Sequence, residues 1–451
     1  MADVLSRKET HSPRATFYTS IYPRKKLLSA VFVLLFTVMM LYLLNTLVAS
    51  SSVIRPLIVQ ASSDFISSGI ATSAASSPFT LYTLTSENIS ATFIPYGARL
   101  TSLLVLNRSG TDQDIVVGYD DPAQYAADSA TNHTYFGTMV GRYGNRIKNG
   151  TFTLDGKTFE IPANENNGAD TLHGGRIGYD QRNWTVTSQS DTSITFTLFD
   201  DAFEGFPGSV ITHATYALSS AISGRRGERN PRLTVRTVSI ALDQATPIML
   251  VPHFYWNLGA FTTPTVLDDQ TLWMPYSKRY VEVDDILVPT GALGTVASRP
   301  VLDFTSPKTI GRDLQGATDL CGHGCTGYDT SFILDRPHGT GAEAMNFPVL
   351  SLWSTTTGIR MDVSTNQQGL QIYSCNGQNG TIPVKASQTQ RNSDVYGGGA
   401  KFIEQHGCVV VETQGWIDGV NHPEWGNSQY WIYSPKTGPA VNHATYDFSI
   451  I

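Results

Sequence analysis

Two patterns of hydrophobic and polar residues divide the chain. From Leu27 to Ile54 no residue is charged, and the first part of this stretch reads LLSAVFVLLFTVMMLYLL. About 20 consecutive apolar residues are needed for a helix to cross a bilayer, so the pattern predicts a transmembrane helix over 27–49. From Phe79 onward, apolar residues instead occur in short alternating runs between turn residues, which is typical of β-strands. The chain is therefore expected to carry one membrane helix followed by a large β domain.

The region 79–451 contains many strand signals. The segments 151–154 (TFTL) and 157–160 (KTFE) flank Asp155-Gly156, a pair that tolerates the positive φ angles of a type I′ turn and so predicts a β-hairpin. The charged stretch 223–232 is expected to be a surface loop. No sustained helical periodicity interrupts the strand signals, and many short strands without helices between them predict an all-β sandwich or barrel. The other strand candidates are 192–199, 233–242, 358–365, 369–374 and 408–413.

The residues around the apolar span predict its orientation. A basic cluster, RKK at 24–26, precedes the span. The positive-inside rule then places residues 1–26 in the cytoplasm and the rest across the membrane, in a type II arrangement. The Ser- and Ala-rich residues 50–78 are interpreted as a stalk that carries an extracytoplasmic domain over 79–451. A cleaved signal peptide, which gives a secreted protein, is the alternative, although its apolar region is usually about 7–15 residues long.

Composition narrows the class of protein further. The formal net charge of −7 argues against a nucleic-acid-binding surface, which is usually basic. The four cysteines are too few for a disulfide scaffold, but in an oxidising compartment they are expected to be at least partly paired. Cys321 and Cys325 are close enough in sequence to bridge within one loop. Six glycosylation sequons fit a secretory route, at Asn88, Asn107, Asn132, Asn149, Asn183 and Asn379.

Two other motifs do not carry a function. The segment 150–158 resembles a phosphate loop, but five residues separate Gly150 from Gly156 where that loop has four. The Cys321-Gly-His323-Gly-Cys325 segment lacks a second pair of ligands at zinc-like spacing. A G-x-S-x-G elbow, the mark of an α/β serine hydrolase, is absent from the sequence.

Clusters of polar and aromatic residues stand where the predicted strands end. Each has a structural explanation when taken alone, but together they supply histidines, carboxylates, arginines, asparagines, glutamines and several aromatics. A sugar site needs aromatic faces and planar polar groups, and a reaction at an anomeric carbon needs one proton donor and one proton acceptor. The clusters are GRYGNRI (141–147), LHGG (172–175), EGFPG (204–208), PHFYWNL (252–258), GYD (327–329), GLQIY (369–373) and ETQGWIDGVNHPEW (412–425).

These seven clusters, in this order, resemble the aldose 1-epimerase (galactose mutarotase) family from about Phe79 to the C-terminus. That family shows the segments GR-x-x-NRI, LHGG, EG-[FY]-PG, H-x-YFNL, G-[FY]-D, PG-x-Q-x-Y and E-x-Q-x-x-PD-x-x-N-x-P. The resemblance implies a β-supersandwich fold, with the sugar bound in an open cleft on one sheet. The chain departs from the pattern at Ile417, where the family has proline before Asp418, and at Trp256, where phenylalanine is usual.

The resemblance also implies roles for individual residues. Glu412 aligns with the family's general base and His253 with its general acid. The implied reaction interconverts the α and β anomers of a free aldose by opening and reclosing the ring, without a cofactor or a metal. The residues that align with sugar-contacting positions are Asn145, Arg146, His173, Asp329 and Gln371.

Three alternatives remain open at this point. A phosphosugar epimerase of the same fold should present a cluster of arginines or lysines to the phosphate, and the clusters offer only Arg142 and Arg146. A membrane-tethered sugar-binding protein is the second alternative, and the presence of both Glu412 and His253 speaks against it. The third is a glycosidase that uses Glu412 and Asp329 as a carboxylate pair.

Overall fold

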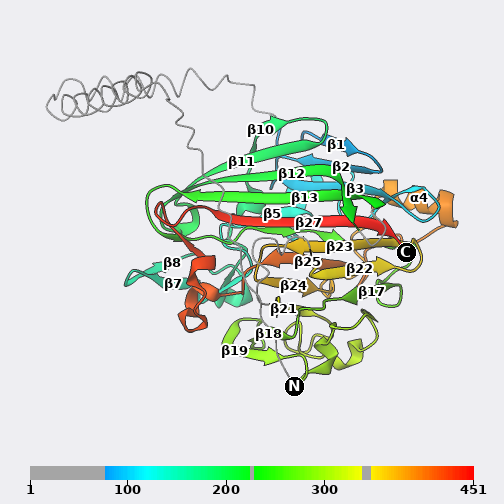
Figure 1. Ribbon diagram of the computed structural model, residues 1–451. Helices are drawn as coiled ribbons and strands as arrows, with labels where there is room; N and C mark the ends of the chain where they lie inside the picture. The colour runs from blue at the N-terminus through cyan, green and yellow to red at the C-terminus, as the bar shows by residue number, and fades with distance from the viewer. Residues whose placement is uncertain (1–76, 224–227, 338–346) are drawn as a thin grey trace, which may run out of the picture. The chain divides into compact units, whose positions relative to one another are not determined.

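The computed structural model of the chain describes residues 77–223, 228–337 and 347–451 (Figure 1). All of them belong to one unit, Ala75–Ile451. The predicted cytoplasmic tail, the transmembrane helix and all but the end of the stalk fall within residues 1–76 and lie outside the described residues. Within the described part of the chain, no helix has the length and apolarity needed to span a bilayer.

The largest sheet has nine antiparallel strands that run across the molecule (Figure 1). Its long strands follow from alternating sequences, such as ITFTLF in β11, which buries every second residue. In spatial order the strands are β10 (Thr185–Gln189), β11 (Ser193–Asp201), β12 (Ser209–Ser223), β13 (Glu228–Ala241), β27 (Ala440–Ile450), β23 (Ile359–Thr365), β22 (Leu350–Ser354), β17 (Gln270–Trp273) and β20 (Lys308–Thr309).

Two further sheets pack against the first. The six-stranded sheet comprises, in spatial order, β16 (Tyr255–Trp256), β25 (Val409–Gln414), β24 (Gly369–Tyr373), β21 (Asp329–Ile333), β18 (Arg279–Val283) and β19 (Pro289–Thr295). The four-stranded sheet comprises β1 (Tyr82–Ser86), β2 (Ile89–Ile94), β3 (Arg99–Leu106) and β4 (Asp112–Asp114). All three sheets contribute side chains to one large apolar cluster, for example Tyr216 from β12, Val411 from β25 and Phe93 from β2. This shared core holds the sheets together.

Short paired strands and two helices complete the described part of the chain. The strand pairs are β5 (Thr138–Val140) with β15 (Val251–His253), β6 (Arg146–Lys148) with β9 (Asp170–Leu172), β7 (Thr151–Leu154) with β8 (Lys157–Glu160), and β14 (Thr246–Pro247) with β26 (Ile432–Tyr433). The helices are α3 (Gln124–Ser129) and α4 (Ala386–Tyr396). The prediction of an all-β domain is therefore confirmed in its main part, as a mostly β fold with few helices.

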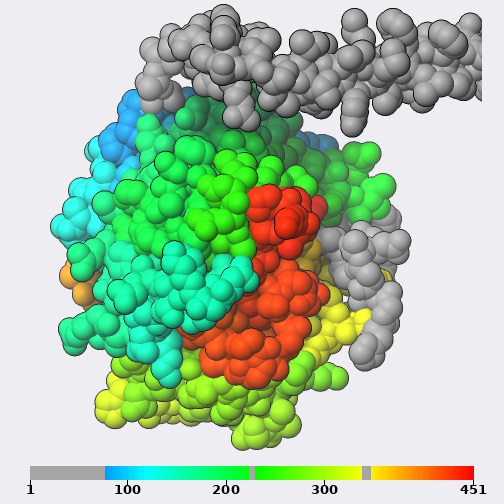
Figure 2. All heavy atoms as spheres, turned by 90° about the vertical axis from the view of Figure 1, so that its left-hand side faces the viewer, coloured from blue at the N-terminus to red at the C-terminus, as the bar shows by residue number. Residues whose placement is uncertain are grey.

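The predicted hairpin at 151–160 is confirmed, and the structure shows what it packs against. Asp155 and Gly156 both have positive φ angles, as the turn requires. The hairpin lies beside the C-terminal turn that follows β25 (Figure 2), and Asn421 Nδ2 donates a hydrogen bond to the Thr151 carbonyl at 2.9 Å. Segments about 270 positions apart in the chain thus meet on this face.

Two expectations about local structure were wrong. The stretch 223–232 is not wholly a loop, because β13 begins at Glu228 and Arg232 pairs with Asp447 of β27 at 2.5 Å. Helix α4 was missed because its buried positions are polar. Gln388 donates to the backbone carbonyls of Asp114 and Val116, so no apolar stripe marks the helix in the sequence.

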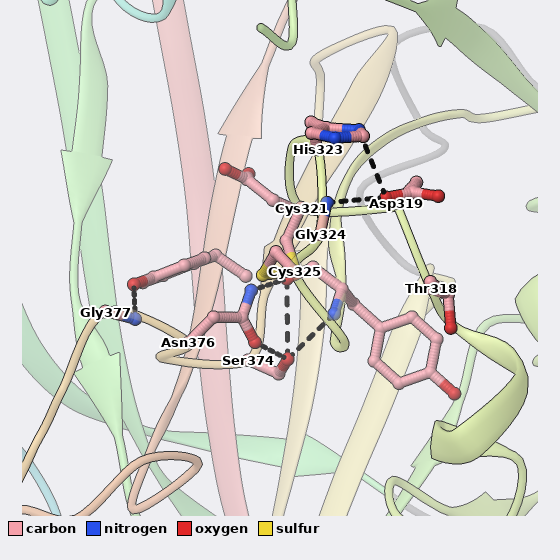
Figure 3. The surroundings of a disulfide bond; sticks show 12 residues. Thr318, Asp319, Cys321, His323, Gly324, Cys325, Ser374, Asn376 and Gly377 are labelled. Carbon is pink, nitrogen blue, oxygen red and sulfur yellow. Dashed lines mark hydrogen bonds and ion pairs between the residues drawn. A yellow bond between two sulfur atoms is a disulfide. The ribbon is translucent and has the colours of Figure 1, made fainter. Parts of the chain in front are cut away.

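All four cysteines are paired, as the oxidising-compartment argument expected in part. Cys321 bridges Cys325 within one loop (Figure 3), and Cys375 bridges Cys408. The sequons are mostly exposed, which leaves glycosylation a prediction. Asn107 is the exception, since it is 2% exposed and donates a hydrogen bond to the Tyr396 hydroxyl, so it is not accessible as an acceptor.

Candidate active site

The residues singled out in the sequence converge on one cavity of about 350 Å³. Gln371 differs from the other six, because it does not line the cavity but donates a hydrogen bond from Nε2 to Asp329 Oδ1 at 2.5 Å. It therefore holds the carboxylate of Asp329, which lines the cavity, in place. The six that line the cavity are Asn145, Arg146, His173, His253, Asp329 and Glu412.

Strand alternation explains why the carboxylates reach the cavity. In β25, Val409 and Val411 belong to the main apolar cluster, so Glu412 points to the opposite face of the sheet. In the antiparallel register, Glu412 is directly opposite Gln371 of β24. Gln371 in turn is one strand away from β21, which begins at Asp329. The face turned away from the core thus collects polar side chains from three adjacent strands.

His253 comes from outside the six-stranded sheet and meets Glu412 across the cavity. It ends β15, which pairs with β5, so that His253 is opposite Thr138. His253 Nε2 lies 3.5 Å from Glu412 Oε1, and the two residues are only 4% and 3% exposed. His253 Nδ1 and Glu412 Oε2 are buried without a hydrogen-bond partner among the described residues. The pair is therefore buried, close together and left with unused hydrogen-bonding capacity.

Burial also shifts the pKa values of this pair. It lowers the pKa of His253 to about 3. Burial raises the pKa of Glu412 well above its ordinary value, and the nearby negative charge of Asp329 adds to this effect. Both shifts favour the neutral forms, a carboxylic acid on Glu412 and a neutral imidazole on His253, over a buried ion pair.

His173 is a second neutral histidine in the cavity. Burial lowers its pKa well below the ordinary value, and the positive charge of a protonated His253 would lower it further. Its Nδ1 accepts a hydrogen bond from the backbone N–H of Asn145 at 3.1 Å. A neutral imidazole that accepts at Nδ1 carries its proton on Nε2, so His173 presents a donor at that atom. The LHGG segment thus supplies a polar contact next to His253, whose ring centroid is 5.0 Å away.

Arg146 connects the carboxylates on one side of the cavity. Its Nε and NH2 atoms donate to the two carboxylate oxygens of Glu165 at 2.7 and 2.9 Å, a bidentate arrangement. Its NH1 atom lies 4.0 Å from Asp329 Oδ2. Burial alone would lower the pKa of Arg146, but the charges of Glu165 and Asp329 outweigh it and raise the pKa. The guanidinium is therefore held in a fixed orientation at the cavity wall.

Several lining residues were missed in the sequence. Tyr135 stacks on His133 with ring centroids 4.0 Å apart and meets the edge of His173 at 4.7 Å. Tyr135 stands six residues before the GRYGNRI cluster, and its aromatic ring so close to that cluster was the one feature of the sequence that could have marked it as a site residue. Glu165 and Gln378 also line the cavity, and neither belongs to a strand pattern or a recognisable cluster. They are brought to the site by loops, whose course the sequence pattern does not reveal.

Comparison with known proteins agrees with this geometry. The family model described as aldose 1-epimerase matches residues 80–430. A "probable aldose 1-epimerase" of Arthroderma benhamiae is 55% identical over 389 residues, which cover 84% of this chain and 88% of the relative. The galactose mutarotase of Sus scrofa is 30% identical over 365 residues, covering 81% of this chain and 92% of that protein.

Solved structures show the same fold. The crystal structure of a GalM/aldose epimerase homologue from C. elegans superposes with a TM-score of 0.66 and 24% sequence identity. The match covers 82% of this chain and 99% of that one. The fold, the order of the motifs and the family match agree, and the chain belongs to the aldose 1-epimerase family.

Proposed function

We propose that this protein interconverts the α and β anomers of free aldohexoses such as glucose or galactose, with Glu412 and His253 as its acid–base pair. Membership of an isomerase family supports the reaction class. The observation that carries the assignment of residues is the buried pair itself, with Nε2 and Oε1 3.5 Å apart and one unused hydrogen-bonding atom on each side chain. An acid and a base so placed can act on two oxygen atoms of one sugar.

The proposed cycle moves two protons and returns both. Glu412, as carboxylate, takes the proton of the anomeric hydroxyl while His253, as imidazolium, donates to the ring oxygen, and the bond from C1 to the ring oxygen breaks. The open aldehyde then turns about its C1–C2 bond, and the reverse transfers close the ring on the other carbonyl face. No cofactor takes part in these steps.

Burial favours the protonation state that follows ring opening. After opening, the proton lies on Glu412 and His253 is neutral, which is the arrangement that burial favours. Binding of a cyclic sugar therefore has to be accompanied by transfer of one proton from Glu412 to His253. Hydrogen bonds from sugar hydroxyls to the two charged groups would offset the cost of that transfer, and binding energy would thus drive the pair into its reactive form.

The charges of the cavity favour a neutral sugar over a phosphosugar. Among the described residues that line it, Arg146 is the only arginine or lysine, and it is already paired with Glu165. The lining carboxylates of Glu165 and Asp329, two negative charges beside one guanidinium, would repel a phosphate. The sugar hydroxyls instead meet Asn145, His173 and Asp329, which supply amide, imidazole and carboxylate partners.

An anomer-exchange assay tests the proposal. Freshly dissolved α-glucose or α-galactose is followed by polarimetry, with the spontaneous rate in buffer subtracted, beside a hydrolysis assay on an aryl glycoside. We expect accelerated anomer exchange and no hydrolysis. A protein that binds the sugars without accelerating exchange would be a sugar-binding protein instead, and release of the aryl group would make it a glycosidase.

We further propose that the domain is extracytoplasmic and attached to the membrane through residues 27–49. The basic cluster at 24–26 and the uncharged span that follows support this orientation. Protease protection on intact membranes tests it, because digestion of the large domain from the cytoplasmic side would contradict it. The N-terminal residue of the mature protein distinguishes a retained anchor from a cleaved signal peptide.

A further inference from the structure

We infer that Gln378 binds the sugar and helps decide which aldoses are accepted, and that the Cys375–Cys408 disulfide holds Gln378 in place. This inference rests on the proposed function, since it assigns to the same cavity a specificity-determining residue outside the seven sequence clusters. Gln378 lines the cavity in the segment between β24 and α4.

The side chain of Gln378 is buried but has no partner. The residue is 9% exposed, and its backbone N–H donates to the Cys375 carbonyl at 3.2 Å. No hydrogen bond joins its side-chain amide to any described residue. The amide is not sealed inside the protein but reaches the cavity, where a ligand can take the place of the missing protein partner. An amide offers two donors and one acceptor in a plane, which suits a pair of neighbouring sugar hydroxyls.

The strand register places Gln378 away from the reacting pair. Glu412 is opposite Gln371, and Tyr373 lies two residues further along β24, about 6–7 Å at the usual rise per residue. Tyr373 is opposite Asp329 in the neighbouring strand. Gln378 follows beyond this end of β24, so it is expected to meet sugar hydroxyls distant from the anomeric carbon. Such contacts distinguish one aldose from another without taking part in proton transfer.

The segment that carries Gln378 is held on two sides. On one side, Cys375 is bridged to Cys408, the residue directly before β25, and both cysteines are fully buried. On the other side, Ser374 Oγ accepts a hydrogen bond from the Tyr328 backbone N–H at 2.9 Å, and Asn376 Nδ2 donates to the Tyr328 carbonyl at 2.9 Å.

Figure 3 shows this second attachment, with Ser374, Asn376 and Gly377 beside the Cys321–Cys325 bridge. The Gly377 backbone N–H also donates to the Tyr373 hydroxyl at 2.8 Å. The turn before Gln378 is thus tied to Tyr373 of β24 and to Tyr328, the residue directly before β21. The disulfide ties it to Cys408, directly before β25. The Cys375–Cys408 bridge is therefore a positioning element for Gln378.

The test compares sugar preference in Gln378→Ala and in the wild type. Mutarotation and calorimetric binding are measured with glucose, galactose and xylose, of which the last two each differ from glucose in a single ring substituent. We expect KM and Kd to rise about 5- to 50-fold for the preferred sugar, by amounts that differ among the three, while kcat changes less than about two-fold. Gln390→Ala is the matched control, because Gln390 is an exposed glutamine on α4 that bonds to Asp394 of the same helix and does not line the cavity.

The disulfide is tested with Cys375→Ala/Cys408→Ala, beside Cys321→Ala/Cys325→Ala as its control. The first double variant should reproduce the KM changes of Gln378→Ala and add little to them when combined with it, whereas the control should keep the wild-type preference. If the first double variant does not fold, the Cys321→Ala/Cys325→Ala variant treated with reductant takes its place, once a thiol count shows that the buried Cys375–Cys408 bridge has opened, with the same expectation. Unchanged preference in either form overturns the positioning role.

The failure of this inference differs from failure of the proposed function. If wild type binds sugars but does not accelerate mutarotation, the proposed function fails, and weaker binding by Gln378→Ala still supports the contact. If wild type is active and Gln378→Ala keeps KM and Kd within about two-fold for all three sugars, the inference is overturned.

Discussion

Arg142 and Arg146 stand four residues apart in the same sequence cluster, yet the regions around them differ in how many nitrogens of each guanidinium have a close partner. Arg142 is 1% exposed, and each of its three nitrogens has a partner, including the Asp200 carboxylate at 2.8 Å and the Gly208 carbonyl at 2.8 Å. Arg146 faces the cavity, and its NH1 atom has only the distant Asp329 carboxylate at 4.0 Å. In the first region every nitrogen of the guanidinium is used to join segments of the fold. In the second region one nitrogen, NH1 of Arg146, is left facing the cavity without a close partner.

The same contrast separates two other buried pairs. Lys385 Nζ donates both to Asp114 Oδ2 and to the Thr101 carbonyl, each at 2.8 Å, so this pair is enclosed by its own hydrogen bonds. His253 and Glu412 are as deeply buried, yet each has an atom without a partner. The Lys385–Asp114 pair is thus satisfied by the fold, whereas the His253–Glu412 pair retains capacity for a ligand.

The largest expected effect is on the cavity side of this comparison. His253→Asn keeps a polar group of similar size but removes the acid, so kcat for anomer exchange should fall about 10²–10⁴-fold while the melting temperature stays near that of wild type. His213→Asn is the matched control, since His213 lies on β12 and bonds Thr197 instead of lining the cavity. Equal losses in both variants would show that the effect is not specific to the cavity.

The next largest effect is on the structural side. Arg142→Met removes one partner of a buried ion pair and leaves the Asp200 carboxylate without its cation, which should cost about 3–5 kcal/mol of unfolding free energy. The kcat of the folded fraction should remain close to that of wild type. Denaturant titration measures the loss of unfolding free energy, and kinetics normalised to the folded fraction measure kcat. A variant that is stable but inactive would place Arg142 in the catalytic machinery, against this account.

A smaller effect is expected at Arg146. Arg146→Lys keeps the charge but loses the bidentate contact with Glu165, so kcat/KM should fall about ten-fold. The loss of stability should be smaller than for Arg142→Met. Kinetics on the preferred aldose and denaturant titration measure both quantities, and a larger stability loss at Arg146 than at Arg142 would reverse the comparison.

The smallest effect concerns pH and stability. The pKa of Glu412 is raised in the folded protein, so its contribution to stability is present below its unfolded pKa and is lost as pH rises through the folded value. The pKa of His253 is lowered to about 3, so its contribution is present above its unfolded pKa and is lost as pH falls toward that value. Glu412→Gln should therefore gain stability relative to wild type as pH rises above the ordinary pKa of a glutamate. Denaturant titrations at several pH values check this, and a constant difference would contradict it.

The site was predictable where a strand delivers a residue and less so elsewhere. Glu412 follows the apolar run of β25, and alternation alone predicts that it leaves the core face. Gln371 donates its amide to Asp329, which only the cross-strand register reveals, and its contact with the sugar stays a prediction. Glu165 and Gln378 reach the cavity from loops, which have no hydrophobic periodicity in the sequence. Helix α4 packs through polar side chains, so it has no apolar stripe either.

The most direct test of the central claim is a double-mutant cycle on Glu412→Gln and His253→Asn, with kcat for anomer exchange measured above the buffer rate. If the two residues share one proton and act as a unit, the double variant should lose about as much activity as the worse single variant, far less than the product of the two losses. Losses that multiply would mean that the two groups act independently. Near wild-type rates in both single variants would contradict the mechanism altogether.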